Sequence, residues 1–380
     1  MNKKLISALI AITLSLPTTA YAAGLKNRTD STPAVAILDT AIDTSLPAFQ
    51  GKIIQEVCIL EWTTCPNGQS FMEGPGAASM PSDLIVKNGF DHGTQMTSVF
   101  LKTNPDVNVV FIKIIGNTST GLRQNAGEAS VYNALRWVKN NASKYNIQAV
   151  TMSQGMHNLG APGTDYCPKT PTTQQAVKDL ISIGVPTFFP SGNGRDYSRI
   201  DWPGCIDDSI SVGYVDQQNE ISIASNNDTE KLDFFAPGFF SVAGPNNVVK
   251  NISGSSAAIQ FAGAQWIKLK SAKPSYSYDE ILSTLRATAS STIGRQGKFA
   301  KLINISAAIS YNASTPTPTG PTAEELAAQK AAADAAAKAA IKADVDAQIA
   351  KAQAEYDAAV KLAADKLAAI KAAQLARLNG

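Results

Sequence analysis

Four short stretches of the sequence carry side chains that could take part in one reaction. A serine pair, Ser255 and Ser256, follows a glycine at the start of an Ala-rich run. Upstream lie a histidine in DHGTQMTS (His92), an aspartate that ends an apolar run (Asp39) and an asparagine between two glycines (Asn193). A serine hydroxyl becomes a nucleophile when a base removes its proton, and histidine titrates in the right range. The set therefore supplies a nucleophile, a base, a carboxylate to orient the base and an amide donor for an oxyanion.

Each of these residues also has an ordinary structural explanation when it is taken alone. Asp39 could cap a turn after a strand, and His92 could bond the backbone at a helix start. Asn193 could occupy a left-handed turn, and serine is a preferred helix N-cap. Their order along the chain, Asp then His then Ser, is one of the three orders known for this chemistry on unrelated folds. The combination therefore favours acyl transfer through a covalent intermediate.

The segments around these residues predict the elements that must position them. Five continuous apolar runs are typical of strands buried on both faces; they span 34–38, 107–115, 147–152, 185–189 and 210–215. Helical periodicity at 127–142 and 172–184 falls between several of these runs. The alternation predicts an α/β fold, a mostly parallel twisted sheet with helices on both faces in three layers. Catalytic groups of such sheets gather at the carboxyl ends of the strands.

The first 22 residues differ from the rest of the chain. Lys3 and Lys4 precede an apolar run, and the segment closes on Ala20-Tyr21-Ala22, a small-x-small cleavage pattern. This arrangement predicts a secretory signal peptide over 1–22, and hence a secreted or periplasmic protein. A membrane anchor is the alternative, but the run is too short to span a bilayer comfortably.

The composition changes again near the C-terminus. We expect a single large α/β domain over 23–312, a Pro/Thr linker over 313–322 and an Ala/Lys-rich helical tail over 323–380. Thr322 and Glu325 fit a capping box that opens the tail helix. The narrow apolar stripe of this helix allows a coiled coil, through which the chain self-associates or docks on a partner. A solvated spacer is the alternative.

Charge and cysteine content narrow the classes of partner. The net charge is +2 with no basic block in mid-chain, so we expect no nucleic-acid partner. No later segment is apolar enough to span a membrane. Four cysteines in an exported chain favour disulfides. Of the three possible connectivities we favour Cys58–Cys65, which closes a short loop, together with Cys167–Cys205. Zinc is the alternative, but no C-x-x-C spacing is present, and two histidines cannot supply a multi-His metal centre.

The quoted motifs and their order resemble the subtilisin-like serine proteases (subtilases) over residues 33 to 310. The family's Asp-Thr-Gly-Ile-Asp, His-Gly-Thr, Ser-Leu-Gly and Ala-Gly-Asn motifs correspond to 39–43, 92–94, 153–155 and 191–193. WPGCIDDSISVGYVD at 202–216 and GKFAKLINISAAI at 297–309 resemble two further family segments.

The resemblance implies a secreted endopeptidase that hydrolyses peptide bonds of a polypeptide substrate. Asp39, His92 and Ser256 would form the catalytic triad, and Asn193 would bind the oxyanion. Substrate would add as an extended strand along Ser153, Gln154 and Gly155.

The resemblance implies less about the remaining features. The insert from Met156 to Cys167 would wall the specificity pocket, and His157 within it is either a surface-loop residue or a substrate contact. No cofactor is expected. Bound calcium is common in the family, but no ligands can be assigned in this sequence.

The serine pair allows two registers against the family motif Gly-Thr-Ser. Matching Gly254-Ser255-Ser256 directly makes Ser256 the nucleophile and runs without a gap to Pro274. Choosing Ser255 requires a one-residue insertion inside a helix, which rotates everything after it by about 100°. That rotation would move the buried face of the helix, so the sequence favours Ser256.

The sequence also departs from the family. Ala41 replaces a glycine, Gln260 replaces a helix proline, and the short stretch from Ala22 to Asp39 has little room for a folding propeptide. Two alternatives to hydrolysis therefore stay open. One is a catalytically weak binding or structural protein that works through its tail. The other is a peptide ligase or cyclase that uses the same residues.

Overall fold

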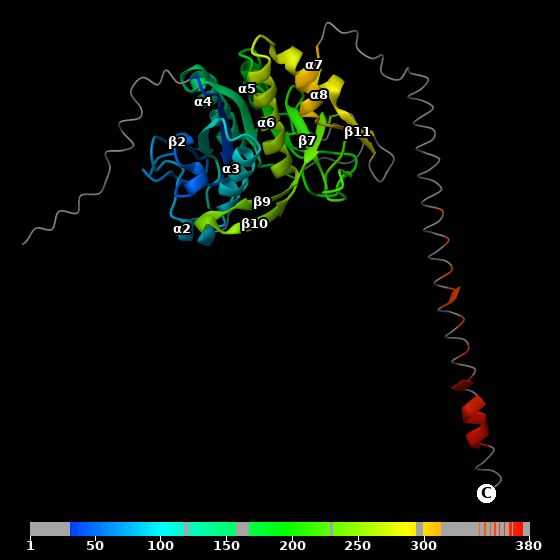
Figure 1. Cartoon of the computed structure of the whole chain (residues 1–380). Helices are drawn as coiled ribbons and strands as arrows, with labels where there is room; N and C mark the ends of the chain where they lie inside the picture. The colour runs from blue at the N-terminus through cyan, green and yellow to red at the C-terminus, as the bar shows by residue number, and fades with distance from the viewer. Residues whose placement is uncertain are drawn as a thin grey trace, which may run out of the picture.

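The computed structural model describes residues 31–117, 121, 123–156, 167–228, 231–293 and 299–312, with separate tail positions between 342 and 374 (Figure 1). Within these residues, ten strands form one sheet in the order β11-β12-β8-β7-β6-β5-β1-β4-β2-β3. The strands are β1 (Ala34–Asp39), β2 (Ile53–Ile59), β3 (Phe71–Glu73), β4 (Asn108–Lys113), β5 (Ile147–Met152), β6 (Thr187–Pro190), β7 (Ile210–Val215), β8 (Phe234–Pro237), β11 (Ser290–Ile293) and β12 (Phe299–Leu302). All neighbouring pairs are parallel except β2–β3 and β11–β12 at the two edges.

Helices follow most of the central strands. They are α2 (Ser82–Lys87), α3 (Asp91–Thr103), α4 (Glu128–Tyr145), α5 (Pro171–Ile181), α6 (Ser255–Ala272), α7 (Tyr278–Thr288) and α8 (Ile305–Ser310), with 3₁₀ turns η2 (Pro47–Phe49) and η3 (Pro245–Asn247). A separate antiparallel ribbon joins β9 (Phe239–Ala243) to β10 (Val249–Ser253), directly before α6. None of the described helices has the length and apolar character that a membrane span requires.

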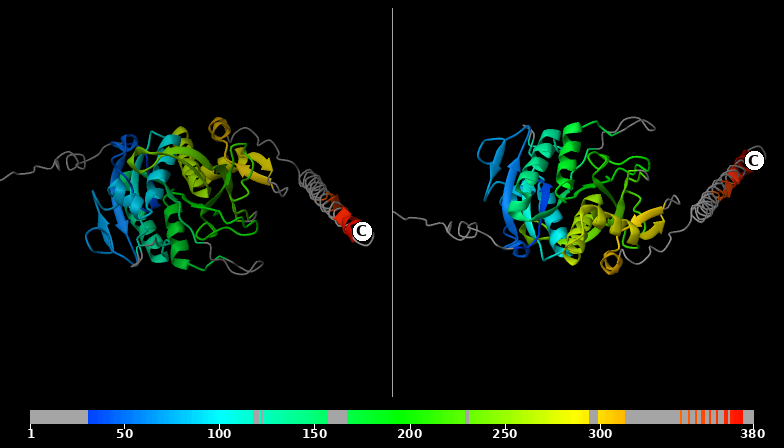
Figure 2. Two further views of the ribbon diagram at one scale, coloured as in Figure 1. Left: turned by 90° about the horizontal axis from the view of Figure 1, so that it is seen from below. Right: turned by 90° about the horizontal axis from the view of Figure 1, so that it is seen from above.

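The predicted fold class is confirmed, since the sheet is mostly parallel and carries helices on both faces (Figure 2). The right-hand view of Figure 2 shows α4 and α5 on one side of the strands and α6 on the other. The strand predicted from residue 185 begins at Thr187. Pro186 has no N–H for the ladder and contributes only its carbonyl, which accepts from Val150 N at 2.9 Å.

Strand β1 shows why its sequence is apolar without interruption. Ala34, Ala36 and Leu38 belong to the hydrophobic cluster that contains the inner faces of α4 and α5. Val35 and Ile37 point the other way, into the cluster that contains α6. Side chains alternate between the two faces of a strand, and both faces of this sheet are covered, so each position must be apolar.

Helix α6 lies in the interior of the protein. Twelve of its eighteen residues are buried, and it packs against β5, β6, β7 and β8 as well as against α3. The fully buried Trp266 packs edge-on against Phe188 of β6, with ring centroids 6.0 Å apart. It also contacts the tilted ring of Tyr278 in α7, at a centroid distance of 5.3 Å. A helix that is apolar on nearly all sides is a core helix. The start of α6 is therefore held by the main hydrophobic core.

The expected signal peptide lies outside the described residues. The described positions of the tail between 342 and 374 are all helical and exposed, and Lys342 pairs with Asp346 at 2.5 Å. Self-association through the tail stays a prediction.

Candidate active site

Asp39 and His92 form a hydrogen-bonded pair where β1 ends and α3 begins. His92 Nδ1 lies 2.9 Å from both carboxylate oxygens of Asp39, which is fully buried, and Thr40 N donates to Asp39 Oδ1 at 2.7 Å. Burial alone would raise the pKa of Asp39. The His92 imidazole, Arg123 and the Thr40 N–H outweigh it and hold the pKa of this carboxyl below its ordinary value. The buried carboxylate can therefore orient His92 and stabilise its protonated form.

The first turn of α3 is pressed against the end of β1. Thr40 Oγ1 accepts from Gly93 N at 3.0 Å and donates to Phe90 O at 2.7 Å. A Cβ on Gly93 would lie 2.4 Å from Ala41 O, so only glycine allows this approach. Ala41 is itself buried and has no positive φ, so the methyl that replaces the family's glycine strains no backbone here.

The N-terminus of α6 separates the roles of the two serines. Asn193, which follows β6, accepts hydrogen bonds at Oδ1 from Ser255 N at 3.0 Å and Ser255 Oγ at 3.1 Å. Ser255 is fully buried, whereas Ser256 is partly exposed. Gly254 has φ +142°, a conformation that L-residues rarely adopt, and the Asn193 amide lies against it. Asn193 thus caps the helix, and its NH₂ group is turned away from Ser255.

Ser153 and Gln154, which follow β5, connect Ser256 to the Asp39–His92 pair. Ser153 Oγ donates to Ser256 O at 2.9 Å, and Ser256 Oγ donates to Ser153 O at 3.3 Å. Gln154 Nε2 donates to Asp39 Oδ1 at 2.9 Å and lies 3.1 Å from His92 Nδ1. The carboxyl ends of the neighbouring strands β1, β5 and β6 thereby bring together all the residues that the sequence nominated for catalysis.

Ser256 and His92 are not joined by any of the hydrogen bonds within the described part of the chain. They begin two helices, α6 and α3, that pack side by side, and Ala257, Met96 and Val99 share one hydrophobic cluster. Catalytic hydrogen bonds are often long or misaligned in the absence of substrate. The structure therefore shows an Asp–His pair and a neighbouring serine whose hydroxyl bonds the carbonyl of Ser153.

The side chain of Gln154, a residue predicted to bind substrate along the strand edge, contacts Arg123 and Asp39. Its Oε1 accepts from the exposed Arg123, so its NH₂ group must face Asp39. Sequence analysis missed Arg123, which carries no motif. Arg123 lies on the connection between β4 and α4, and nothing in the sequence indicates its contact with Gln154 until the fold places the two together.

A buried lysine beside Asp39 was also missed. Lys113 is the ladder neighbour of Asp39 in β4, donates to Thr40 O at 2.9 Å and Ile115 O at 2.6 Å, and lies 3.7 Å from the centre of the Phe90 ring. Burial lowers the pKa of Lys113 to about 7, although the Asp39 carboxylate acts to raise it. A polar residue within an apolar strand was the available signal.

Gln260, which replaces the helix proline of the family, links α6 to β5. It is fully buried; its Oε1 accepts from Thr151 Oγ1 at 2.9 Å, and its Nε2 donates to Ser153 Oγ at 2.9 Å. Ser153 in turn contacts Ser256. Side-chain hydrogen bonds therefore hold the helix start where the family uses a rigid ring.

We expect Gln260→Met to lower the free energy of unfolding by about 1–3 kcal/mol, because it leaves buried hydroxyls short of partners while conserving volume. Urea denaturation measures the change. Gln265→Met on the same helix is the matched control, since Gln265 Oε1 is buried and accepts no hydrogen bond from any residue that the structure describes. Equal losses in the two variants would contradict a specific role for the Gln260 bridge.

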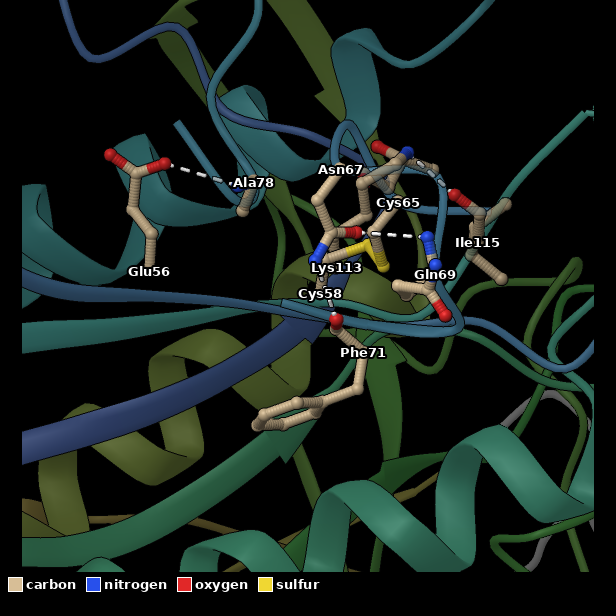
Figure 3. The surroundings of a disulfide bond; sticks show 10 residues. Glu56, Cys58, Cys65, Asn67, Gln69, Phe71, Ala78, Lys113 and Ile115 are labelled. Carbon is tan, nitrogen blue, oxygen red and sulfur yellow. Dashed lines mark hydrogen bonds between the residues drawn. A yellow bond between two sulfur atoms is a disulfide. The ribbon is translucent and has the colours of Figure 1, made fainter. Parts of the chain in front are cut away.

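All four cysteines are paired as the sequence favoured. Cys58 bonds Cys65, and Cys167 bonds Cys205, so none of them is available as a zinc ligand. Figure 3 shows the first bond, in which Cys58 of β2 is the ladder neighbour of Lys113. The second bond ties residue 167 to the segment that follows Asn193.

Two further expectations concern the loop that contains His157 and the binding of calcium. His157 and residues 158–166 lie outside the described residues. Across the described ranges no cluster of three or more His, Cys, Asp or Glu side chains could hold a metal ion, so we assign no calcium ligands.

The sheet order, the helix layers and the junction of β1, β5 and β6 with α3 and α6 define the subtilisin-like α/β class. The chain belongs to the subtilase family, whose sequence profile matches residues 30–338.

Relatives of known sequence are distant. The alkaline protease of Alkalihalobacillus alcalophilus is 26% identical over 230 residues, which cover 57% of this chain and 54% of the relative. Subtilisin Savinase of Lederbergia lenta is 26% identical over 230 residues, covering 57% and 76%. The chain thus spans about half the length of the first relative and about three quarters of the second.

Solved structures share the fold at lower identity. A cold adapted subtilisin-like serine proteinase superposes with a TM-score of 0.54 at 19% identity, over 72% of this chain and 89% of that one. The nisin leader peptidase NisP from Lactococcus lactis superposes with a TM-score of 0.57 at 13% identity, over 73% and 87%.

Proposed function

We propose that the chain is a secreted serine endopeptidase that hydrolyses peptide bonds through an acyl-enzyme on Ser256. The observation that carries the proposal is the Ser153–Gln154 pair. It contacts the partly exposed serine of α6 on one side and the Asp39–His92 pair on the other. Membership of the subtilase family supports the same reaction class.

His92 acts as the general base in this proposal. The Ser256 hydroxyl leaves its hydrogen bond with Ser153 O and donates instead to His92 Nε2. His92 takes the proton, and Ser256 Oγ attacks the scissile carbonyl carbon. Asp39 accepts a hydrogen bond from His92 Nδ1–H, remains ionised and stabilises the imidazolium. His92 then protonates the leaving amine, and a water molecule, deprotonated by His92, releases the acyl group.

The oxyanion is received by Asn193 and the helix terminus. The first N–H groups of a helix have no intrahelical partner, and the positive end of the α6 dipole lies at Ser256. Asn193 Oδ1 accepts hydrogen bonds from Ser255, so the NH₂ group of Asn193 points away from Ser255. Asn193 Nδ2 and Ser256 N–H are the proposed donors. The mechanism needs no cofactor.

Product analysis tests the reaction class. The mature chain is incubated with an unfolded protein in water enriched in heavy oxygen, and the peptides are analysed by mass spectrometry. Hydrolysis predicts new C-termini that carry heavy oxygen. Joined or cyclic peptides without it would indicate a ligase, and intact substrate would favour a binding protein.

We expect Asn193→Ala to lower kcat by about 10²- to 10³-fold, because it removes one oxyanion donor. Steady-state hydrolysis of a peptide substrate measures the loss, and a loss under threefold would contradict the role. Asn193→Asp separates the two tasks of this side chain. It keeps an acceptor for Ser255 N–H but has no NH₂ group, so we expect low kcat with an unchanged urea midpoint.

Secretion and assembly belong to the same proposal. The basic, apolar and small-x-small segments of residues 1–22 support export, and the paired cysteines fit an oxidising compartment. The tail helix is proposed to hold the domain on a partner or a second copy.

A further inference from the structure

We propose that Gln154 and Arg123 are positioning residues for the Asp39–His92 pair. The Gln154 amide ties the carboxylate of this pair to the backbone edge where substrate is proposed to add, and Arg123 fixes the direction in which that amide faces. The inference rests on the proposed endopeptidase activity and extends its site by two side chains that act through Asp39.

The Asp39 carboxylate lies among hydrogen-bond donors. Its Oδ1 accepts from Thr40 N at 2.7 Å and from Gln154 Nε2 at 2.9 Å, and His92 Nδ1 lies 2.9 Å from both oxygens. An ionised carboxylate is only an acceptor and offers about four positions, so it satisfies all three donors. A protonated carboxyl would turn an O–H toward one of them. The arrangement therefore favours the ionised form, and Gln154 supplies one of its donors.

The Gln154 amide lies between a cation and an anion. The residue is buried; its Oε1 accepts from Arg123 Nη2, and its Nε2 donates to Asp39 Oδ1. Turned by half a rotation, the amide would set its oxygen against the carboxylate and its NH₂ group against the guanidinium. Both contacts would be repulsive, so the two charges fix one orientation. Hydrogen bonds in such a chain polarise one another, which strengthens the bond to Asp39.

Arg123 is exposed, but its backbone is held beside the site. Asn117, which follows β4, forms an antiparallel bridge with Arg123, and Gln124 N donates to Gly116 O at 2.9 Å. The guanidinium therefore reaches the Gln154 amide from an anchored part of the connection between β4 and α4.

The other charges around the pair have their own partners. Burial acts to raise the pKa of Asp39, whereas the His92 imidazole and then the Arg123 guanidinium act to lower it. Lys113, the ladder neighbour of Asp39 in β4, donates to two backbone carbonyls. Asp91, adjacent to His92, accepts from a glutamine one turn further along α3. Arg123 is therefore the cation whose effect on the carboxylate passes through the Gln154 amide.

The backbone of Gln154 belongs to the edge on which substrate is proposed to pair, between Ser153 and Gly155. Ser153 O accepts from Ser256 Oγ at 3.3 Å, so consecutive residues of this edge contact the proposed nucleophile and the Asp39 carboxylate. A displacement of the edge would change the position of one relative to the other. The Gln154 side chain thus serves positioning, while its backbone is left to pair with substrate.

Gln154→Met keeps the length of the side chain and the backbone of the edge but removes both hydrogen bonds. With a peptide that the wild-type chain cleaves, we expect kcat to fall by about 10- to 150-fold, the range for one hydrogen bond to a charged group. KM should change less than about threefold, because the substrate pairs with backbone groups. A side chain that bound the substrate directly would raise KM instead.

The pH profile of kcat/KM gives a readout that a merely structural role would not move. Its acidic limb reports protonation of the Asp39–His92 pair as a unit. Arg123→Met removes a cation that opposes this protonation, so the pair takes up its proton at higher pH. We expect the limb to rise by about half to one pH unit, within the usual spread for ionisable groups in proteins. Arg123→Lys keeps a cationic donor and should restore the wild-type profile.

Two substitutions of the same kind are the matched controls. Gln148→Met changes a glutamine near the other end of β5, and Arg136→Met removes an exposed arginine that lies over the Tyr132 ring on α4. Both should leave kcat and the acidic limb unchanged. Urea denaturation of each variant separates a loss of positioning from a loss of fold. Because Arg123 is exposed, Arg123→Met decides the question even where Gln154→Met fails to fold.

Two results would overturn the inference and leave the endopeptidase standing. One is a Gln154→Met variant whose kcat stays within about threefold of wild type or falls no further than that of Gln148→Met. The other is an acidic limb that stays in place in Arg123→Met. A chain that cleaves no peptide and reacts with no fluorophosphonate overturns both the inference and the proposed endopeptidase.

Discussion

Ser256→Ala is expected to abolish labelling by a fluorophosphonate probe and to lower kcat by about 10⁶-fold, the loss found when a subtilisin loses its nucleophile. Ser256 is the partly exposed serine at the second position of α6, and its hydroxyl donates to Ser153 O on the edge where substrate is proposed to pair. The adjacent Ser255 cannot replace it, because Ser255 is fully buried and bonded to Asn193.

Ser255→Ala is the control for this experiment. The change removes one hydrogen bond to Asn193 but leaves the Ser255 N–H that Asn193 caps, so labelling should persist. Labelling is read by in-gel fluorescence and located by peptide mapping. Labelling that survives Ser256→Ala and disappears in Ser255→Ala would assign the nucleophile to Ser255.

Asp39→Asn is expected to lower kcat by about 10⁴-fold without unfolding the protein. The Asp39 carboxylate accepts hydrogen bonds from Thr40 N, His92 Nδ1 and Gln154 Nε2. An amide offers only one oxygen to these three donors, and its NH₂ group favours the wrong tautomer of His92. Steady-state kinetics measures the loss.

Circular dichroism and urea denaturation provide the control for Asp39→Asn. A variant that retains more than a tenth of wild-type kcat would exclude Asp39 as the residue that orients His92. Loss of activity with loss of fold would indicate only a structural role for this buried carboxylate.

The central part of the fold could be predicted because its signals are local. A strand covered on both faces must be apolar throughout, and β1, β4, β5, β6 and β7 therefore stand out in the sequence. The strands at and beside the two edges of the sheet could not be predicted in this way. Strand β3 has three residues and β11 and β12 have four each, and each of them contains a polar residue, so none forms a continuous apolar run.

The candidate site residues could be nominated from the sequence because each lies in a short motif beside a strand or a helix start. The contacts of Gln154, Arg123, Lys113 and Gln260 depend instead on side chains that are distant in sequence. Gln260 and Thr151 are 109 positions apart, and Gln154 and Asp39 are 115 apart. Hydrogen bonds between such distant positions depend on the order of the strands in the sheet, and they produce no periodic pattern in the sequence.

The burial of α6 links the position of Ser256 to the stability of the whole domain. Ser256 is placed by a helix that the main core surrounds, and this helix packs against four strands of the sheet. A substitution that loosens the core around α6 would therefore displace Ser256 as well as destabilise the fold. Variants of this core should lose turnover and resistance to denaturant together.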